Sequence, residues 1–452
     1  MAASASQVKL SSNHCGVFHV PSVTEESAAK ASQVLQENHE KHHIFLNESG
    51  FHSTSATCTS SPASRFHSPF VDNPLQITHH VLTLYALGAS PELIQTHYDR
   101  NKTYQQKSPP LHNAILQDLH DYKKFHDYLG NQRYYHDYLK HFQSEIDKKG
   151  YENVINEYCL QGDERADDML VRLHAGFLHP LIHLGFGVEF KQPAIVAEAL
   201  AQAAAHDSWI GAFLLDAEKA AASTGKGKPM IELLDEVRAD KKLSSAANWN
   251  DSNKIRDGIL VRAPQEMIRI AAQWKVSPGA IIEKTAEMTN AVAYYTGGAQ
   301  HPPKQVKFDF YYIHCLNSSI FYDAFLKEAT GISDKNKARL LEWKGRLDLC
   351  MYASRRSPEP RMDVINQYEP MHPETAKGTG AGSWDGIFTR VLHHDDDGHA
   401  AKLVRALAHG ENICAAYSMN DPLFRIKGDA WLQLGHMAID SVEDTGVNWV
   451  RS

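Results

Sequence analysis

The sequence predicts an all-α fold, a large multi-helix assembly with little or no sheet. Turn residues stand where helices joined by short connections would begin and end: Ser90-Pro91 can start a helix and Gly88 can end the one before it. Apolar residues also recur at intervals of three and four, as at Trp431 and Leu434. Alternating β-type stretches flanked by hairpin turns are nearly absent from the chain. These observations favour helices throughout.

The 452 residues are expected to form a flexible N-terminal arm and a single large helical catalytic domain. The arm, residues 1–22, begins with a Ser- and Ala-rich stretch of a kind that is often poorly ordered. No Pro/Gly-rich linker divides the domain, residues 23–452, although a candidate seam lies near residues 224–256. Residues 47–72 are rich in Ser and Thr, yet their phenylalanines would pack against a core, which predicts a packed strap.

Composition excludes several classes of protein. The 46 Lys and Arg residues against 54 Asp and Glu leave a net charge of −8, and no basic stripe could follow a phosphate backbone, so nucleic acid is not an expected partner. No signal-peptide core and no run of about 18 apolar residues occurs, which predicts a cytoplasmic protein that does not cross a membrane. The six cysteines are scattered without a C-x-x-C pair, which favours reduced thiols over disulfides or zinc fingers.

Histidine is the residue type that needs an explanation, since the chain has 27 His, as many as Gly. Histidine ligates metals and moves protons near neutral pH. The strongest pattern, residues 174–187, contains His179 and His183 four residues apart. Pro180 disfavours a helical residue before it, so His179 should start a new helix whose one face carries both imidazoles, about 6 Å apart at Cβ. Two rings at that spacing can share a metal ion, although the pattern lacks the glutamate of H-E-x-x-H metalloproteases.

Two further histidine positions could join that site. His79 and His80 are adjacent, and because neighbouring helical residues diverge by about 100°, at most one can face the core. Spacing favours His79, and a shift of face would favour His80. His314 lies in an aromatic, strongly apolar segment with Asn317 three residues later. Asn317 could orient His314 through its second ring nitrogen, and the alternative is a core histidine bonded to a carbonyl.

The segment HHDDDGHAAKLVRAL, residues 393–407, is explained better by a capped helix than by a metal site. Asp397 would be its N-cap, and His399, which points along the helix, is the member to retain as a candidate. His174 precedes His179 by five residues and points elsewhere unless the chain breaks at Gly176. The candidate catalytic residues are His79, His80, His174, His314, Asn317 and His399.

Other cofactor sites are not supported by the sequence. The Gly-rich segment KGTGAGSWDG, residues 377–386, lacks the third glycine of G-x-G-x-x-G and follows no strand, and the chain has no P-loop or Rossmann fingerprint. No G-x-S-x-G elbow of a serine hydrolase is present either. Metal chemistry is therefore the function class that the residues favour.

Four blocks of sequence resemble the questin oxidase-like family of fungal polyketide-tailoring enzymes. They are, in order, THHVLTLYALGAS, LVRLHAGFLHPLIHLGFGVEF, FYYIHCLNSS and DGHAAKLVRAL, and the similarity runs from about residue 70 to the C-terminus. The resemblance implies an oxygenase that opens the central ring of anthraquinones, in some members by Baeyer–Villiger insertion. It is closest to the ring-cleaving dioxygenases that use non-haem iron. It also implies an aromatic polyketide substrate and dioxygen as partners.

The resemblance turns a metal site into an iron(II) site. Non-haem iron commonly binds a carboxylate besides imidazoles, and the histidine motifs supply none. The resemblance implies that Lys377 takes this role as a carbamate formed with CO2, and the alternative anion is Asp309 or Glu189. The implied metal ligands are His79, His179, His183, His314 and Lys377. The implied aromatic walls of the pocket are Phe177, Phe186, Tyr311 and Trp384.

Several versions of the chemistry stay open at this point. Ring cleavage through a reduced hydroquinone would need a separate quinone reductase, because the chain lacks a nicotinamide motif, and a homo-oligomer is a further expectation. The rival enzyme is a metal-free or NADPH-assisted Baeyer–Villiger oxidase, in which the histidines act as acids and bases. A zinc hydrolase and a helical scaffold that binds a pigment are the remaining alternatives.

Overall fold

Helices make up 68% of the computed structural model and strands 3%, which confirms the all-α prediction. The structure describes residues 4–46, 76–327, 331–373, 384–418, 421–444 and 448–451. The strap predicted at residues 47–72 and the candidate ligand Lys377 lie outside these ranges. The strands form two short pairs, one antiparallel and one parallel: β1 (His42–Leu46) with β2 (Gln105–Lys107), and β3 (Phe308–Asp309) with β4 (Trp449–Val450).

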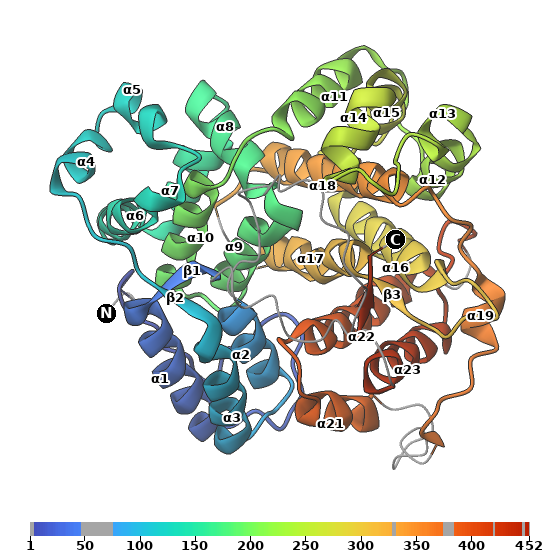
Figure 1. Ribbon diagram of the computed structural model, residues 1–452, viewed down its shortest axis with the longest axis horizontal. Coiled ribbons are helices and arrows are strands. Elements are labelled where there is room, and N and C mark those ends of the chain that lie inside the picture. The colour runs from blue at the N-terminus through green and yellow to red at the C-terminus, as the bar shows by residue number, and fades with distance from the viewer. Residues whose placement is uncertain are drawn as a thin grey trace, which may run out of the picture.

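The α-helices follow one another through short connections in most of the chain (Figure 1). The first half contains α1 (Glu25–Lys41), α2 (Gln76–Ala86), α3 (Pro91–Asn101), α4 (Asn113–Asp118), α5 (Tyr122–Phe125), α6 (Tyr135–Lys149), α7 (Tyr151–Ile155), α8 (Glu164–Leu173), α9 (His179–Glu189), α10 (Pro193–Ala205) and α11 (Gly211–Ser223). The second half contains α12 (Met230–Ala239), α13 (Lys241–Ser244), α14 (Leu260–Arg262), α15 (Pro264–Ala271), α16 (Ile281–Gly298), α17 (Phe310–Lys327), α18 (Asp334–Ser354), α19 (Met362–Asn366), α21 (Asp385–His393), α22 (His399–Ser418) and α23 (Ala430–Glu443).

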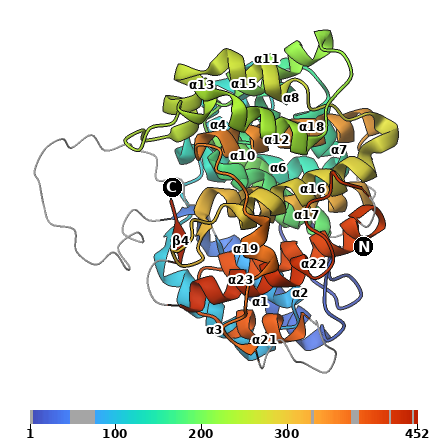
Figure 2. The same ribbon diagram turned by 90° about the vertical axis from the view of Figure 1, so that its right-hand side faces the viewer.

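Helix α17 is the centre of the packing. It contacts α9, α16, α18 and α22, which surround it in Figure 1. Figure 2 shows α11, α13 and α15 gathered at one end of the molecule and α1, α3 and α21 at the other. Every residue of α9 is buried, as expected for a helix that is apolar on all sides. The histidines on α9 and α17 are therefore carried into the interior, where a polar ring needs a partner.

The described part of the N-terminal segment, residues 4–22, packs against the rest of the chain, and the division into an arm and a domain stays a prediction. Ala5, Val8 and Leu10 are buried. Further along this segment, the backbone nitrogen of Val17 donates to Glu189 on α9, whose carboxylate also pairs with Arg405 on α22. Because the segment supplies groups to this buried ion pair, it helps to join two helices that carry candidate histidines.

The buried apolar residues form a continuous cluster that includes residues on both sides of 224–256, and the seam near that segment stays a prediction. Among the described residues, no helix combines the length and the apolar character that crossing a bilayer requires.

Candidate functional site

A sharp break between α8 and α9 positions the first histidine. Gly176, Phe177 and Leu178 have φ angles of 51°, 54° and 69°, and two of these three residues are not glycine. A left-handed conformation at a non-glycine residue costs about 1–3 kcal/mol and is kept only where the surroundings enforce it. His179 then begins α9 with Pro180 in its first turn, which confirms the start predicted from the sequence.

Three buried histidines from different helices meet beside this break, and we call them the histidine trio. The Nε2 atoms of His179 on α9 and His314 on α17 are 3.1 Å apart. The Nε2 atom of His399, the first residue of α22, lies 3.4 Å from that of His314. The fold therefore brings His399 next to His314, and His314 next to His179, although these residues are far apart in the sequence.

The hydrogen bonds of the trio fix where its lone pairs lie. His314 Nδ1 is 2.7 Å from the carbonyl oxygen of Phe310, which can only accept, so this nitrogen carries the hydrogen. His399 Nδ1 donates in the same way to the Asp397 carboxylate at 2.5 Å. In the neutral rings both Nε2 atoms therefore carry lone pairs, and these face each other. Facing lone pairs repel each other. A cation between them removes this repulsion, and His179 Nε2, 3.1 Å from His314 Nε2, relieves it in part where it carries a hydrogen.

Burial disfavours a proton as that cation. It lowers the pKa of His179 and His314 well below the ordinary value, and at His399 the Asp397 carboxylate opposes burial without overcoming it. Two nitrogens that bind one ion at about 2.1 Å are about 3.0–3.4 Å apart, the spacing found here. The trio thus fits a metal ion in donor type and in spacing between neighbours. Among the described residues, however, no group of three or more His, Cys, Asp and Glu side chains meets the geometry of a metal site as a set.

A second group of buried side chains forms a hydrogen-bonded row that we call the Glu198 chain. His79 Nε2 lies 3.1 Å from His183 Nδ1, and His183 Nε2 lies 2.7 Å from Glu198. The other oxygen of Glu198 accepts from His39 Nδ1 at 2.6 Å, and His39 Nε2 is 2.8 Å from Gln143. Burial would raise the pKa of Glu198, but the hydrogen bonds from both histidines outweigh it and lower the pKa to about 2.

The adjacent residues His79 and His80 have different partners in the structure. His80 Nδ1 accepts from the Asn101 side chain at 3.0 Å, and its ring packs on His97 with centroids 4.8 Å apart. His79 is thus the member of the pair that reaches His183. Its ring also stacks on Phe186 at 5.0 Å, so Phe186 belongs to this group.

The expected role of Asn317 is wrong. The carbonyl of Phe310 holds His314 Nδ1, and neither polar atom of the buried Asn317 side chain has a hydrogen-bond partner among the described residues. A helical histidine can bond the carbonyl four residues earlier without any side-chain partner, which was the alternative left open.

The alternative anionic ligands, Asp309 and Glu189, and the expected pocket residue Trp384 make contacts away from the trio. Asp309 accepts from the backbone nitrogens of Tyr311 and Tyr312 at the start of α17, and Glu189 pairs with Arg405. Trp384 donates to Glu411 at 2.7 Å. The carboxylate next to the trio is Asp397, and the N-cap role predicted for it is taken by Asp396, which accepts from the backbone nitrogens of residues 398 and 400.

Two important residues were missed in the sequence. Glu198 is a lone acid in the otherwise apolar segment PAIVAEALAQAAA, and that isolation was its signal. Lys402 lies one turn after His399, and burial lowers its pKa to about 8. Its charge acts on all three rings of the trio and disfavours their protonation.

A cavity of about 100 Å³ is separated from the trio by Phe177, and none of the three histidines is part of its lining. Phe177 is part of its lining, and the ring of Phe177 is 6.5 Å from that of His179 and 6.3 Å from that of His314. Tyr311, also a lining residue, packs on Phe177 at 4.7 Å. Of the four aromatic walls that the sequence predicted, Phe177 and Tyr311 line this cavity.

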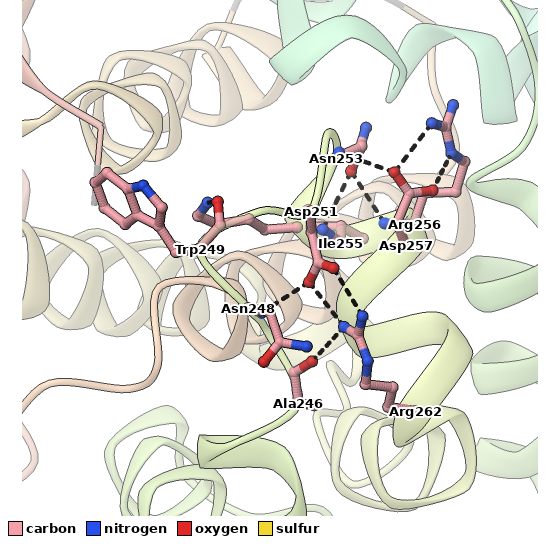
Figure 3. Close-up of polar contacts among 10 residues, drawn as sticks. Ala246, Asn248, Trp249, Asp251, Asn253, Ile255, Arg256, Asp257 and Arg262 are labelled. Carbon is pink, nitrogen blue, oxygen red and sulfur yellow. Dashed lines mark hydrogen bonds and ion pairs between the residues drawn. The ribbon is translucent and has the colours of Figure 1, made fainter. Parts of the chain in front are cut away.

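One wall of the cavity is a loop stiffened by its own polar contacts (Figure 3). Asp251 accepts from both terminal nitrogens of Arg262 at 2.7 Å, and the Asn253 side chain caps the following π-helix, residues 254–259, by accepting from Ile255 and Arg256. Figure 3 shows Trp249 pointing away from this network. The wall therefore has a defined shape, and the charge of Asp251 is balanced by Arg262.

Comparison with known proteins identifies the class of protein that this fold and site represent. Residues 76–407 match the model of the questin oxidase-like family, and the chain belongs to that family. It is 36% identical to a Baeyer–Villiger monooxygenase of Cryptosporiopsis sp., covering 99% of this chain and 96% of the relative. It is 35% identical to the questin oxidase of Aspergillus terreus with the same coverage of both chains. A Baeyer–Villiger oxidase of Pestalotiopsis fici is 36% identical over 98% of this chain and 94% of its own. These names support an oxidoreductase.

Proposed function

We propose that this protein is a non-haem iron oxygenase that uses dioxygen to cleave a ring of an anthraquinone-type polyketide. The observation that carries the proposal is the facing of the His314 and His399 lone pairs in a buried site next to an aromatic-lined cavity. The substrate class comes from the family and from a relative named questin oxidase.

His179, His314 and His399 would hold the iron. Bound there with open positions, iron(II) would supply the activation of dioxygen that imidazole ligands leave room for. Asp397 orients His399 through Nδ1 and adds a buried negative charge one imidazole away from the ion. A Lys377 carbamate remains a proposed ligand, whereas His79 and His183 are the alternative ligands, which the effect of replacing Glu198 on iron content would test.

The residues around the cavity would bind and orient the substrate. Phe177 and Tyr311 present aromatic faces to a flat ring system, and Phe177 is the wall shared with the trio. Phe310 covers the other side, with its ring 4.7 Å from His314 and 5.3 Å from His399, and so helps to exclude water. The Lys402 ammonium would favour an ionised substrate oxygen near the trio.

The electron balance defines the substrate's redox state. A ring-cleaving dioxygenase places both oxygen atoms of dioxygen in the product, so all electrons that reduce dioxygen come from the substrate. A hydroquinone can supply two more electrons than the corresponding quinone. A separate quinone reductase would form that hydroquinone, since the sequence has no nicotinamide fingerprint.

The test combines metal analysis with isotope labelling. Protein purified without oxygen and loaded with iron(II) is mixed with a reduced anthraquinone under ¹⁸O₂. We expect about one iron per chain, loss of activity with a chelator and two ¹⁸O atoms in each product molecule. Full activity of metal-free protein in excess chelator would overturn the iron site.

The second candidate function is a metal-free or NADPH-assisted Baeyer–Villiger oxidase, which the names of two relatives favour. One oxygen atom would enter the product, and the other would leave as water with two electrons from NADPH. A single ¹⁸O atom in the product and a strict need for NADPH would support this candidate.

A further inference from the structure

His174 is a buried histidine in the cavity wall that belongs to neither the trio nor the Glu198 chain. It follows α8 directly, is 2% exposed and lines the cavity. Its Nδ1 is 2.9 Å from the carbonyl oxygen of Leu170, so Nδ1 carries the hydrogen. Its Nε2 therefore carries a lone pair, and this atom has no hydrogen-bond partner among the described residues.

The second ring nitrogen of His174, Nε2, can act only as an acceptor. Burial lowers its pKa to about 4, so the ring is neutral at ordinary pH. A buried acceptor without a partner is unfavourable, and a ligand that brings a hydroxyl donor removes that cost.

The rest of the cavity defines what kind of ligand brings the donor. Phe177, Trp209 and Tyr311 provide flat apolar surfaces. Three cationic side chains, Lys254, Arg355 and Arg451, belong to the same lining, and the Arg355 guanidinium lies 4.2 Å from the centre of the Tyr311 ring. The lining thus offers the neutral acceptor of His174, three cationic side chains and aromatic faces, a pattern that fits a hydroxylated quinone.

We propose that His174 selects substrates with a hydroxyl group that is free to donate, meaning one that is not adjacent to the quinone carbonyl. This inference rests on the proposed function, because it names the substrate feature that the same site recognises. A hydroxyl next to the carbonyl already donates within its own molecule, so its hydrogen is not available to His174. A hydroxyl at the next ring position has no such internal acceptor. Lys254 and Arg355 would then face the carbonyl or an ionised oxygen of the same ligand.

The test measures binding without turnover. The full-length protein is titrated under argon with 2-hydroxyanthraquinone and with 2-methoxyanthraquinone, and quenching of tryptophan fluorescence reports binding near Trp209. We expect the hydroxyl probe to bind about fivefold to tenfold more tightly than the methoxy probe, the effect of one hydrogen bond to a buried acceptor. His174→Leu should remove this preference and leave the affinity for the methoxy probe within about twofold.

Two further variants separate recognition from folding. His174→Gln keeps an acceptor oxygen and should restore at least part of the preference. His436→Leu is the matched control, because His436 is also buried without a hydrogen-bond partner among the described residues but is not part of the cavity lining. This control should bind both probes as the wild type does. If His174→Leu does not fold, His174→Met, which lacks a strong acceptor, takes its place in the same comparison of the two probes.

The outcomes distinguish this inference from the proposed function. Equal binding of both probes by the wild type, or a hydroxyl preference that His174→Leu retains, would overturn the role of His174 and leave oxygen-dependent ring cleavage untouched. Failure of the wild type to bind either probe, together with no oxygen uptake on the reduced forms, would overturn both.

Discussion

The trio and the Glu198 chain are built from the same residue type at the same depth, yet their hydrogen bonding differs. In the chain, His79 can donate to His183, and His183 donates to an ionised carboxylate, so donors meet acceptors. In the trio, the lone pairs of His314 and His399 face each other. Close imidazoles are therefore not all equally suited to a metal: in the Glu198 chain each close contact can join a donor to an acceptor, whereas the facing lone pairs of His314 and His399 are better suited to a cation.

The largest effect is expected from the central ring of the trio. His314→Ala removes the nitrogen that neighbours both other rings, so iron content should fall to near zero and ring cleavage should drop by more than the about 10- to 100-fold typical of a lost supporting residue. Elemental analysis and oxygen uptake measure the two losses. His436→Ala, at a buried histidine outside both groups, should retain iron. An iron-free but active His314→Ala protein would contradict the assignment of the trio, and not the Glu198 chain, as the iron site.

A smaller loss is expected at the carboxylate behind the trio. Asp397→Asn keeps the shape but removes the charge that orients His399, so iron affinity should fall about 10- to 100-fold. Titration with iron(II) in a competing chelator measures this affinity. Unchanged affinity would mean that His399 is held by packing alone and that Asp397 has another task.

The sequence predicted the helix face on which a histidine lies better than it predicted the hydrogen-bond partner of that histidine. Pro180 and the four-residue spacing correctly placed His179 and His183 near the start of one helix, and burial of the region followed from its apolar neighbours. The spacing did not indicate that the two rings turn to different partners, His314 and His79. Helical periodicity fixes the direction of Cβ, whereas the ring's partner depends on which helix packs opposite.

The contacts that the sequence did not reveal are mostly between distant segments. His399 meets His314 only because α22 packs on α17, and Glu198 meets His39 through α10. The left-handed turn at Phe177 is a second case, because two non-glycine residues in that conformation have no local sequence signal. The Asn317 prediction failed for the opposite reason: a nearer backbone carbonyl competed for the same ring nitrogen.

The carboxylate of the Glu198 chain should affect stability more than metal binding. Its pKa is about 2 in the folded protein and 4.5 in the ordinary state, so the stabilisation is present above pH 4.5 and is lost as the pH falls toward 2. The difference corresponds to about 3 kcal/mol. Glu198→Gln should therefore lower the free energy of unfolding by about 3 kcal/mol at pH 6 and by much less at pH 3, as urea denaturation would measure. Iron content should stay that of the wild type. Loss of iron would instead make His183 a ligand supported by Glu198.

The smallest effect is expected at Gln143, at the far end of the Glu198 chain. Replacing this residue tests whether the Glu198 chain contributes to iron binding at the trio. Gln143 contacts His39 Nε2 at 2.8 Å and is separated from His79 by His39, Glu198 and His183. Gln143→Met keeps the volume and removes the hydrogen bond to His39 and the more exposed one from Lys140, so the free energy of unfolding should fall by about 1 kcal/mol. Iron content and turnover should not change, because the contacts from Glu198 to His79 remain intact. A loss of iron comparable to that of Asp397→Asn would show that both groups act as one metal site, since a purely structural chain cannot transmit such a loss over three side chains.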